Sequence, residues 1–197
     1  MKKALEAYWG DKISAEELLK VAKEQRLNTY ATIKEQGVDF VPTGTFSLYD
    51  HVLDMSNTLG IIPDAYAKSG LSQLDTYFAM ARGHQKGGVD LPATEVQKWF
   101  DSNYHYLVPE FSEKSEFKLN DNKPVDDFIE AKEAGYNARP VILGPLTLLW
   151  LGKTSKDAQD PNFNRYSLLP KLAQTYVQLF EKLAAAGAPW VQIGSAH

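Results

Sequence analysis

The sequence contains no cysteine among its 197 residues. A chain without thiols forms neither a disulfide nor a thiolate metal site. Histidine is also scarce: the four present, at positions 51, 84, 105 and 197, include no pair at the spacing of two metal ligands on one helix. Because zinc needs three or four protein ligands, we predict no metal site within this chain.

Long apolar runs are missing too. No stretch approaches the roughly 18 apolar residues of a membrane-spanning helix. The first residues, 1–6, are charged and are not followed by the apolar core of a signal peptide. We therefore expect a cytoplasmic protein with no membrane partner.

Positive charge is in deficit, with 21 lysines and arginines against 25 acidic residues and a net charge of -4. This balance repels nucleic acid, so no nucleic-acid partner is predicted. The hydrophobic fraction of 44% and the charged fraction of 23% are those of an ordinary globular domain.

Helical and extended patterns alternate along the chain. Ser14 and Glu17 form a capping-box pattern before an amphipathic stretch that ends near Gly37. Two further helices are predicted over 124–135 and 166–186, each with a proline in its first turn.

The clearest strand is 139–145, which is apolar without alternation, as parallel strands covered on both faces tend to be. Three more strands are predicted, centred on Phe40, Tyr104 and Val191. The fold class is therefore α/β, with a parallel sheet of about four strands. A closed (βα)8 barrel needs eight strands and about 250 residues, so the sheet is either open or part of a barrel.

The segment 98–106 (KWFDSNYHY) concentrates charge, hydrogen-bonding groups and aromatic rings. If 103–108 is a buried strand, Asn103 and His105 share one face. A polar pair there is either hydrogen-bonded within the core or lines a wet pocket, and the sequence leaves both interpretations of His105 open.

Lys98 also has two interpretations. Its alkyl chain can lie along the ring of Trp99 with the ammonium in water. Alternatively it binds an anion, for which an ammonium is suited. The glycine-rich stretch 83–88 lacks the ending of a phosphate-binding loop and is predicted to be a solvent loop.

Five stretches occur in an order that identifies a family resemblance. They are 2–9 (KKALEAYW), 46–53 (FSLYDHVL), 98–106 (KWFDSNYHY), 141–147 (VILGPLT) and 190–193 (WVQI). Together they closely resemble the N-terminal domain of cobalamin-independent methionine synthase, over essentially the whole of 2–193.

The resemblance implies a methyltransferase that moves a methyl group from 5-methyltetrahydrofolate polyglutamate to homocysteine, giving methionine. Its members consist of two (βα)8 barrels, and the zinc and homocysteine sites belong to the C-terminal barrel. The N-terminal barrel helps to bind the polyglutamate tail, a role that falls here on Lys2 and Lys98. No cofactor is implied within this chain.

The resemblance also implies that this chain is a partial domain. The family's first strand and the arginine of its basic motif are expected before Lys2 and are absent, and after residue 193 the family pattern is replaced by 194–197. We therefore predict that 1–193 is about half of the N-terminal barrel, with strands two to five. The last four residues are predicted to be a linker or tag remnant, and the isolated chain is expected to be inactive.

An alternative of another class remains. Half a parallel barrel leaves two unpaired strand edges, near Phe40 and Val191, that favour self-association. The chain would then be a non-catalytic half-barrel assembly module, and a homodimer through its sheet edges is expected.

Overall fold

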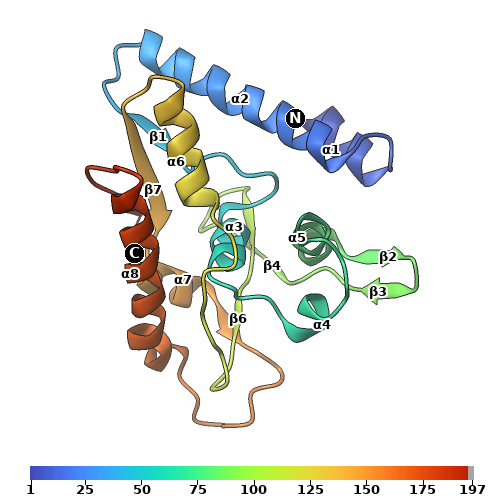
Figure 1. Ribbon diagram of the computed structural model, residues 1–197. Helices are drawn as coiled ribbons and strands as arrows, with labels where there is room; N and C mark the ends of the chain where they lie inside the picture. Colours follow the sequence, from blue (N-terminus) through green and yellow to red (C-terminus); the bar gives the residue numbers. More distant parts are fainter. Residues whose placement is uncertain (195–197) are drawn as a thin grey trace.

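The computed structural model describes residues 1–194 (Figure 1). The α-helices are α1 (Lys2–Trp9), α2 (Ala15–Glu35), α3 (His51–Thr58), α4 (Asp64–Ala67), α5 (Gln73–Arg82), α6 (Lys123–Glu133), α7 (Pro145–Leu151) and α8 (Leu169–Ala185), with a 3-10 turn at Arg165–Leu168. The strands are β1 (Val41–Thr43), β2 (His84–Lys86), β3 (Val89–Leu91), β4 (Val96–Lys98), β5 (His105–Leu107), β6 (Glu110–Phe111), β7 (Ala138–Leu143), β8 (Lys153–Thr154) and β9 (Gln192–Gly194). Within these residues no helix has the length and apolar content needed to cross a bilayer.

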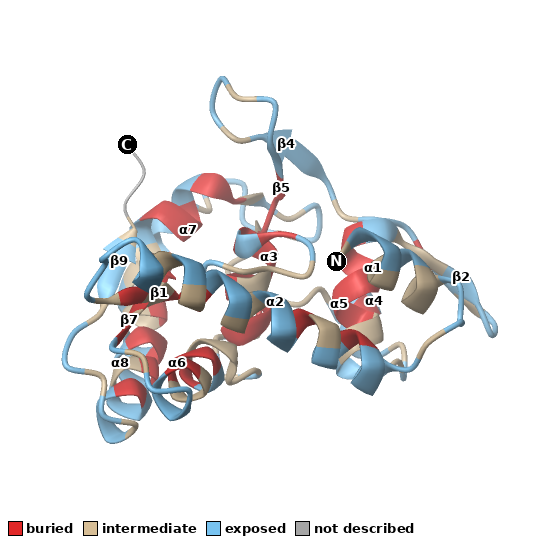
Figure 2. Cartoon of the chain, turned by 90° about the horizontal axis from the view of Figure 1, so that it is seen from above, coloured by how far each residue is buried: buried red, intermediate tan, exposed pale blue. Residues whose placement is uncertain are grey.

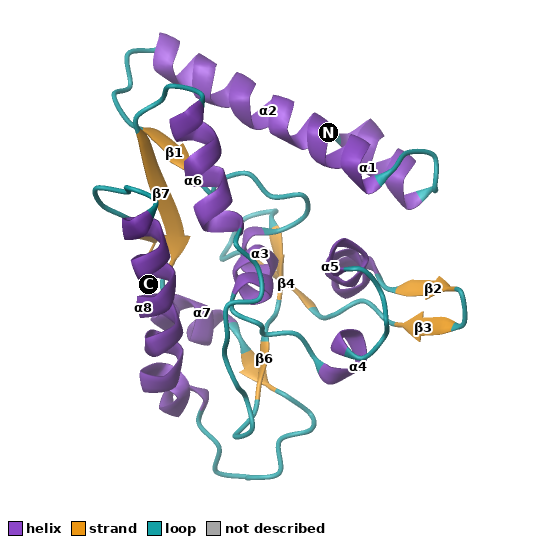
Figure 3. Ribbon diagram, in the orientation of Figure 1, coloured by secondary structure: helices purple, strands orange, loops and turns teal. Residues whose placement is uncertain are grey.

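The main sheet has the strand order β1-β7-β9, and both pairings are parallel. The helices α6 and α8 lie beside it in the view of Figure 3 and pack against the same core. The prediction of a mixed α/β fold with a parallel sheet is confirmed. In the described part of the chain this sheet does not close into a barrel, and nothing pairs with the outer edges of β1 and β9.

The strand predicted around Tyr104 is not part of this sheet. The sheet therefore has three parallel strands where about four were predicted. Instead β5 pairs antiparallel with β4, with Lys98 opposite His105. The two strands form a projecting hairpin, the arm, seen above the rest of the chain in Figure 2. Lys98 and His105 are only seven residues apart, so pairing β4 with β5 closes a short loop. Closing a short loop costs less chain entropy than the long crossover connection that a parallel strand needs.

Burial along β7 alternates, which differs from the expectation that both faces are covered. Ala138, Pro140 and Ile142 are buried, whereas the residues between them are half-buried. One face therefore packs against the helices, and the other is only partly covered. The apolar run fits both situations, because valine and leucine are accepted on a half-buried face as readily as on a buried one.

One local prediction also differs from the structure. The stretch 83–88 contributes to a β2–β3 hairpin, in which Gly87 and Gly88 occupy the turn with φ of 61° and 83°. The helix α3 is capped by Asp50, whose side chain accepts the backbone N–H of Leu53. The capping box of Ser14 and Glu17 is formed as predicted.

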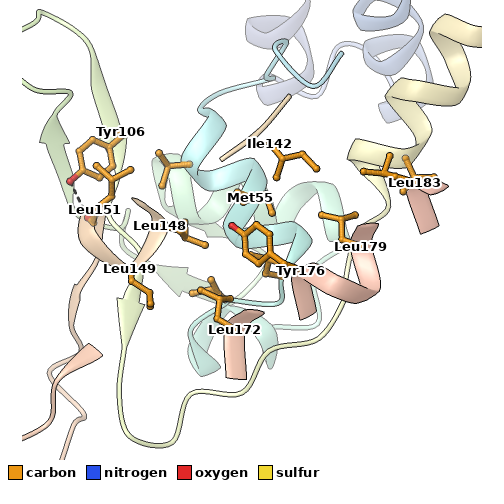
Figure 4. Packing of buried hydrophobic residues seen from close by; sticks show 14 of the residues in the cluster. Met55, Tyr106, Ile142, Leu148, Leu149, Leu151, Leu172, Tyr176, Leu179 and Leu183 are labelled. Atoms are coloured by element: carbon orange, nitrogen blue, oxygen red, sulfur yellow. Dashed lines mark hydrogen bonds between the residues drawn. The ribbon is translucent and has the colours of Figure 1, made fainter. Parts of the chain in front are cut away.

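A first hydrophobic core lies between the main sheet and its helices (Figure 4). Its members from α7 and α8 include Leu148, Leu172 and Leu179, each at most 1% exposed. Two of the three buried tyrosines of this core satisfy their hydroxyls on backbone carbonyls: Tyr176 donates to Leu143 (2.7 Å) and Tyr106 donates to Leu151 (3.0 Å). Burying a tyrosine without such a partner would be costly.

A second core gathers α1, α4, α5 and the β2–β3 hairpin. The long helix α2 reaches both cores, because Leu18 near its start belongs to the second and Tyr30 near its end to the first. Figure 1 shows this helix running across the top of the view, and in Figure 2 it crosses the middle of the picture. Leu53 of α3 and Leu107 of β5 also belong to the second core, so α3 and the base of the arm stand at the junction.

Gly152 gives a test of core packing. A Cβ at this position would lie 2.3 Å from Cε2 of Phe111, which is fully buried, and 2.9 Å from the carbonyl oxygen of Pro109. We expect Gly152→Ala to lower the free energy of unfolding by about 1–3 kcal/mol, because the overlap must be relieved by moving packed groups. Urea unfolding measures this change. A double-mutant cycle with Phe111→Leu should give a loss smaller than the sum of the two single losses, and strict additivity would contradict the overlap.

Candidate functional site

A cavity of about 620 Å³ opens where the parallel strands end. Gly44 and Thr45 follow β1, Leu143 ends β7, and Gly194 ends β9, and all four line it. The carboxyl ends of parallel strands are where α/β sheets bind ligands, since loops of different strands converge there. The half-covered face of β7 supplies Val141 and Leu143 to the cavity wall.

Aromatic rings from two elements form the outer wall. His51, in the first turn of α3, lies edge-on to Trp99 of the arm, with ring centroids 4.7 Å apart. Tyr104 and His105, on the other side of the arm's turn, also line the cavity. The arm therefore carries part of the site.

The inner wall is acidic. Asp54 accepts hydrogen bonds from the hydroxyls of Ser47 (2.6 Å) and Tyr77 (2.7 Å), and the ammonium of Lys123 lies 3.7 Å from it. Burial nonetheless raises the pKa of Asp54 above its ordinary value, because desolvation outweighs these favourable contacts.

Asp50 fastens the arm to α3. Its Oδ2 accepts from the backbone N–H of Leu53 (2.8 Å), which caps the helix, and from that of Leu107 (3.2 Å), in β5. The Tyr77 hydroxyl accepts from the N–H of Asp50 (3.3 Å) and of Tyr49 (3.1 Å). Burial raises the pKa of Asp50 as well, although the two backbone N–H groups work in the opposite direction.

Lys123 is fully engaged within the fold. Its ammonium donates to the carbonyl of Phe46 (2.8 Å) and to Asp127 (2.7 Å), in addition to its contact with Asp54. Behind it, Arg26 of α2 binds Glu130 through two hydrogen bonds of 2.7 and 2.9 Å. These ion pairs join α2, α3 and α6, and they keep the ammonium of Lys123 from pairing with an incoming anion.

The structure brings two of the four predicted site residues together. Lys98 stands opposite His105 in the β4–β5 ladder, so their side chains share one face, and His105 lines the cavity. Asn103 is exposed in the arm's turn and does not line it. Lys2 lies in α1, with 87% of its side chain exposed and its ammonium 3.9 Å from Glu6.

Sequence reasoning did not select Asp50, His51, Asp54 or Lys123 as site residues. A signal was present, since Asp50 and His51 precede Asp54 by four and three residues at the start of one helix, the spacing of neighbours on a helix surface. Lys123 carried no such signal, because only the fold brings α6 next to α3.

A second hollow, of about 990 Å³, lies among loops on another side of the molecule. Its lining includes three lysines and four acidic residues, namely Lys114, Lys118, Lys156, Asp64, Glu110, Glu116 and Asp157. Its opposite charges nearly balance and its lining holds no cluster of rings, so it gives less indication of a ligand than the first cavity.

Within residues 1–194 no three acidic or histidine side chains converge in a way that would hold a metal ion. The chain also supplies no thiolate. The described residues therefore offer no donor set for a zinc ion, which the family resemblance places in the C-terminal barrel.

The raised pKa of Asp54 predicts a pH dependence. A carboxyl whose pKa is higher in the folded than in the unfolded state stabilises the fold below its unfolded pKa of about 3.9. That contribution is lost as the pH rises through the folded value. The unfolding free energy of wild type minus that of Asp54→Asn should therefore decrease from pH 4 to pH 7, as measured by urea unfolding. Asp39→Asn makes the same chemical change at an exposed site and serves as control; a difference for Asp54 that grows with pH would contradict the assignment.

The chain was compared with known proteins. Residues 1–196 match the family described as "Cobalamin-independent synthase, N-terminal domain". The "Probable 5-methyltetrahydropteroyltriglutamate--homocysteine methyltransferase" of Schizosaccharomyces pombe is 52% identical to it over 199 residues. Proteins named as the same methyltransferase in Saccharomyces cerevisiae and Chelativorans sp. are 50% and 48% identical.

Each of these alignments covers 98% of this chain but only 26% of the relative. The chain thus spans about a quarter of the length of the curated relatives that it matches. With a family match over almost its whole length and relatives near 50% identity, the chain belongs to the cobalamin-independent synthase family and corresponds to that family's N-terminal domain.

Proposed function

We propose that this chain contributes binding of the folate polyglutamate tail to a methyltransferase that makes methionine from homocysteine. The relatives' names specify a pteroyltriglutamate methyl donor and homocysteine as acceptor. The observation that carries the proposal is that the side chain of Lys98 is exposed and has no internal ion pair. Lys98 lies at the end of β4, and no carboxylate of the described residues lies within ion-pair distance of its ammonium.

A triglutamate tail is a row of carboxylates, and an ammonium on a projecting arm can meet one of them without first breaking an internal pair. Lys2 is proposed as a second tail-binding residue, since its side chain is also largely exposed and, among residues 1–194, its ammonium pairs only with Glu6, at 3.9 Å. Exposed pairs of this kind are each worth about 0.2–1 kcal/mol. The tail is therefore held by several weak contacts.

The proposed architecture is part of a (βα)8 barrel, with residues 1–193 inside that domain. Three parallel strands separated by helices, and a cavity at their carboxyl ends, support it. The tail 194–197 stays a proposed linker or tag remnant; Gly194 forms the end of β9, and residues 195–197 lie outside the described residues. Zinc chemistry and turnover are assigned to the rest of the longer enzyme, in the cytoplasm.

Binding of 5-methyltetrahydropteroyltriglutamate to this chain tests the proposal. Lys98→Ala should weaken it by about 2- to 5-fold, in line with the loss of one exposed charge pair, and the difference should shrink in 0.5 M salt. Isothermal titration calorimetry gives both affinities. Lys20→Ala, which removes an exposed lysine from α2, is the matched control and should bind like wild type. Equal affinities of Lys98→Ala and wild type at low salt would refute the role of Lys98.

A second candidate function is the half-barrel assembly module. The observation that favours it is the pair of free edges on β1 and β9 in the described sheet, with Ile193 50% exposed and Trp190 45% exposed at one of them. Unpaired parallel edges recruit another strand. In this proposal two copies join the β9 edge of one to the β1 edge of the other.

Light scattering at micromolar concentration distinguishes this candidate. A module that assembles through its edges should give at least twice the 22.1 kDa of one chain. Ile193→Lys places a charge on the β9 edge and should shift the population to monomer, whereas Val177→Lys, at an exposed position of α8, should not. A monodisperse wild-type monomer would rule the assembly out.

A further inference from the structure

We propose that the second hollow, of about 990 Å³, binds the phosphate group of a small phosphorylated molecule. Its lining comes from three segments: 60–64 after α3, 110–118 from β6 onward, and 155–159 after β8. In Figure 1 the last two segments lie beside each other at the lower end of the view. The lining shares no residue with the cavity at the strand ends, so this site is separate from the one described above.

The unpaired charge of this hollow is positive, although its lysines and acids are nearly equal in number. Three of its four acids form ion pairs with lysines that do not line it: Asp64 with Lys68, Glu110 with Lys153 (3.0 Å) and Glu116 with Lys171. The fourth acid, Asp157, has no ion pair among the described residues.

The three lysines of the lining form no ion pair with any carboxylate of residues 1–194 either; they are Lys114, Lys118 and Lys156. All three are exposed, so each ammonium is accessible from solution. Three unpaired ammonium groups therefore share the hollow with one unpaired carboxylate. This excess of positive charge attracts an anion.

Three serine hydroxyls add hydrogen-bond donors. Each serine oxygen of the lining accepts a backbone N–H: Ser112 from Lys114 (3.3 Å), Ser115 from Ser112 (2.9 Å) and Ser155 from Asp157 (3.2 Å). A hydroxyl whose oxygen accepts one bond still has its hydrogen to donate. Within residues 1–194 none of these three hydroxyls donates to an acceptor. The hollow thus offers three hydroxyl and three ammonium groups to a ligand.

The two segments that carry these donors are held together before a ligand arrives. Glu113, which lies outside the lining, accepts the backbone N–H of Gln159 (3.0 Å). The N–H of Ser155 donates to the carbonyl of Phe111 (2.7 Å), next to the parallel pairing of β6 with β8. Donors on walls that are already in place bind an anion with little further loss of conformational freedom.

The donor set favours phosphate over a carboxylate. A carboxylate has only two oxygens, in one plane, whereas a phosphate group presents three acceptor oxygens and a charge of about −1.5 to −2. Because the donors come from two separate segments, they can approach a tetrahedral group from different sides. A phosphate group therefore satisfies more of them at once.

The third segment suits the organic part of such a ligand. It supplies no lysine or hydroxyl to the lining, and three of its residues are apolar or lack a side-chain donor: Ile61, Ile62 and Pro63. The volume lies at the upper end of the range of small-molecule sites, about 300–1,000 Å³, so it exceeds what a phosphate ion alone would fill.

Titration of the full chain with inorganic phosphate and with phenyl phosphate, followed by ¹H–¹⁵N NMR, tests the site. Both probes should shift the backbone N–H signals of Lys114, Ser155 and Lys156. Lys114→Gln and Lys156→Gln should each weaken binding by about 2- to 5-fold, as expected for one exposed charge pair, and the double variant by about 5- to 20-fold. Lys20→Gln removes an exposed lysine from α2 and should bind like wild type.

Phenyl phosphate should bind about 3-fold or more tightly than inorganic phosphate if the apolar segment covers its ring; equal affinities identify free phosphate as the ligand. Unchanged spectra at about 20 mM phosphate, well above a millimolar Kd, would overturn the site, as would equal affinities of the double variant and wild type. A third probe is γ-linked triglutamate. If it shifts the same N–H signals and loses affinity in the same variants, the hollow binds carboxylates and the assignment to phosphate is wrong.

Discussion

The buried hydrogen bonds around Tyr77 join the two halves of this molecule. Tyr77 lies on α5 in the second core, yet its hydroxyl donates to Asp54 of α3 and accepts the N–H groups of Tyr49 and Asp50. Asp50 then holds Leu53 and Leu107, which are members of that same core. These bonds add to the packing of α2, α3 and β5, each of which has members in both cores.

Such a junction is costly, since carboxyl groups are removed from water, and burial raises the pKa of both Asp50 and Asp54. Backbone N–H groups, hydroxyls and the ammonium of Lys123 offset the cost. A buried polar network is stabilising only when its members are satisfied, and it then fixes one arrangement of the surrounding elements. Here that arrangement sets the cavity wall, because the same residues line it.

The incomplete cover of the main sheet explains where the cavity lies. The helices bury one face of β7, and the other face, with Val141 and Leu143, stays half-buried and opens at the strand ends into the space between α3 and the arm. The aromatic residues of the arm and the charged residues at the start of α3 meet only there. A site assembled from such distant segments depends on their packing more than on any single motif.

The sequence by itself determined the local elements and the family. The capping box at Ser14, the proline-initiated helix α6 and the strand β7 follow from short-range chemistry, which acts the same way in any tertiary context. The tertiary structure decided what these rules leave open. It paired β5 with β4 rather than with β7, placed His105 at a cavity and left Asn103 outside, and brought Lys123 to Asp54 across 69 positions of sequence. Strand pairing and long-range contacts depend on which groups can be buried together at the smallest loss of chain entropy and solvation. A single stretch of sequence does not determine them, because the competing partners lie elsewhere in the chain.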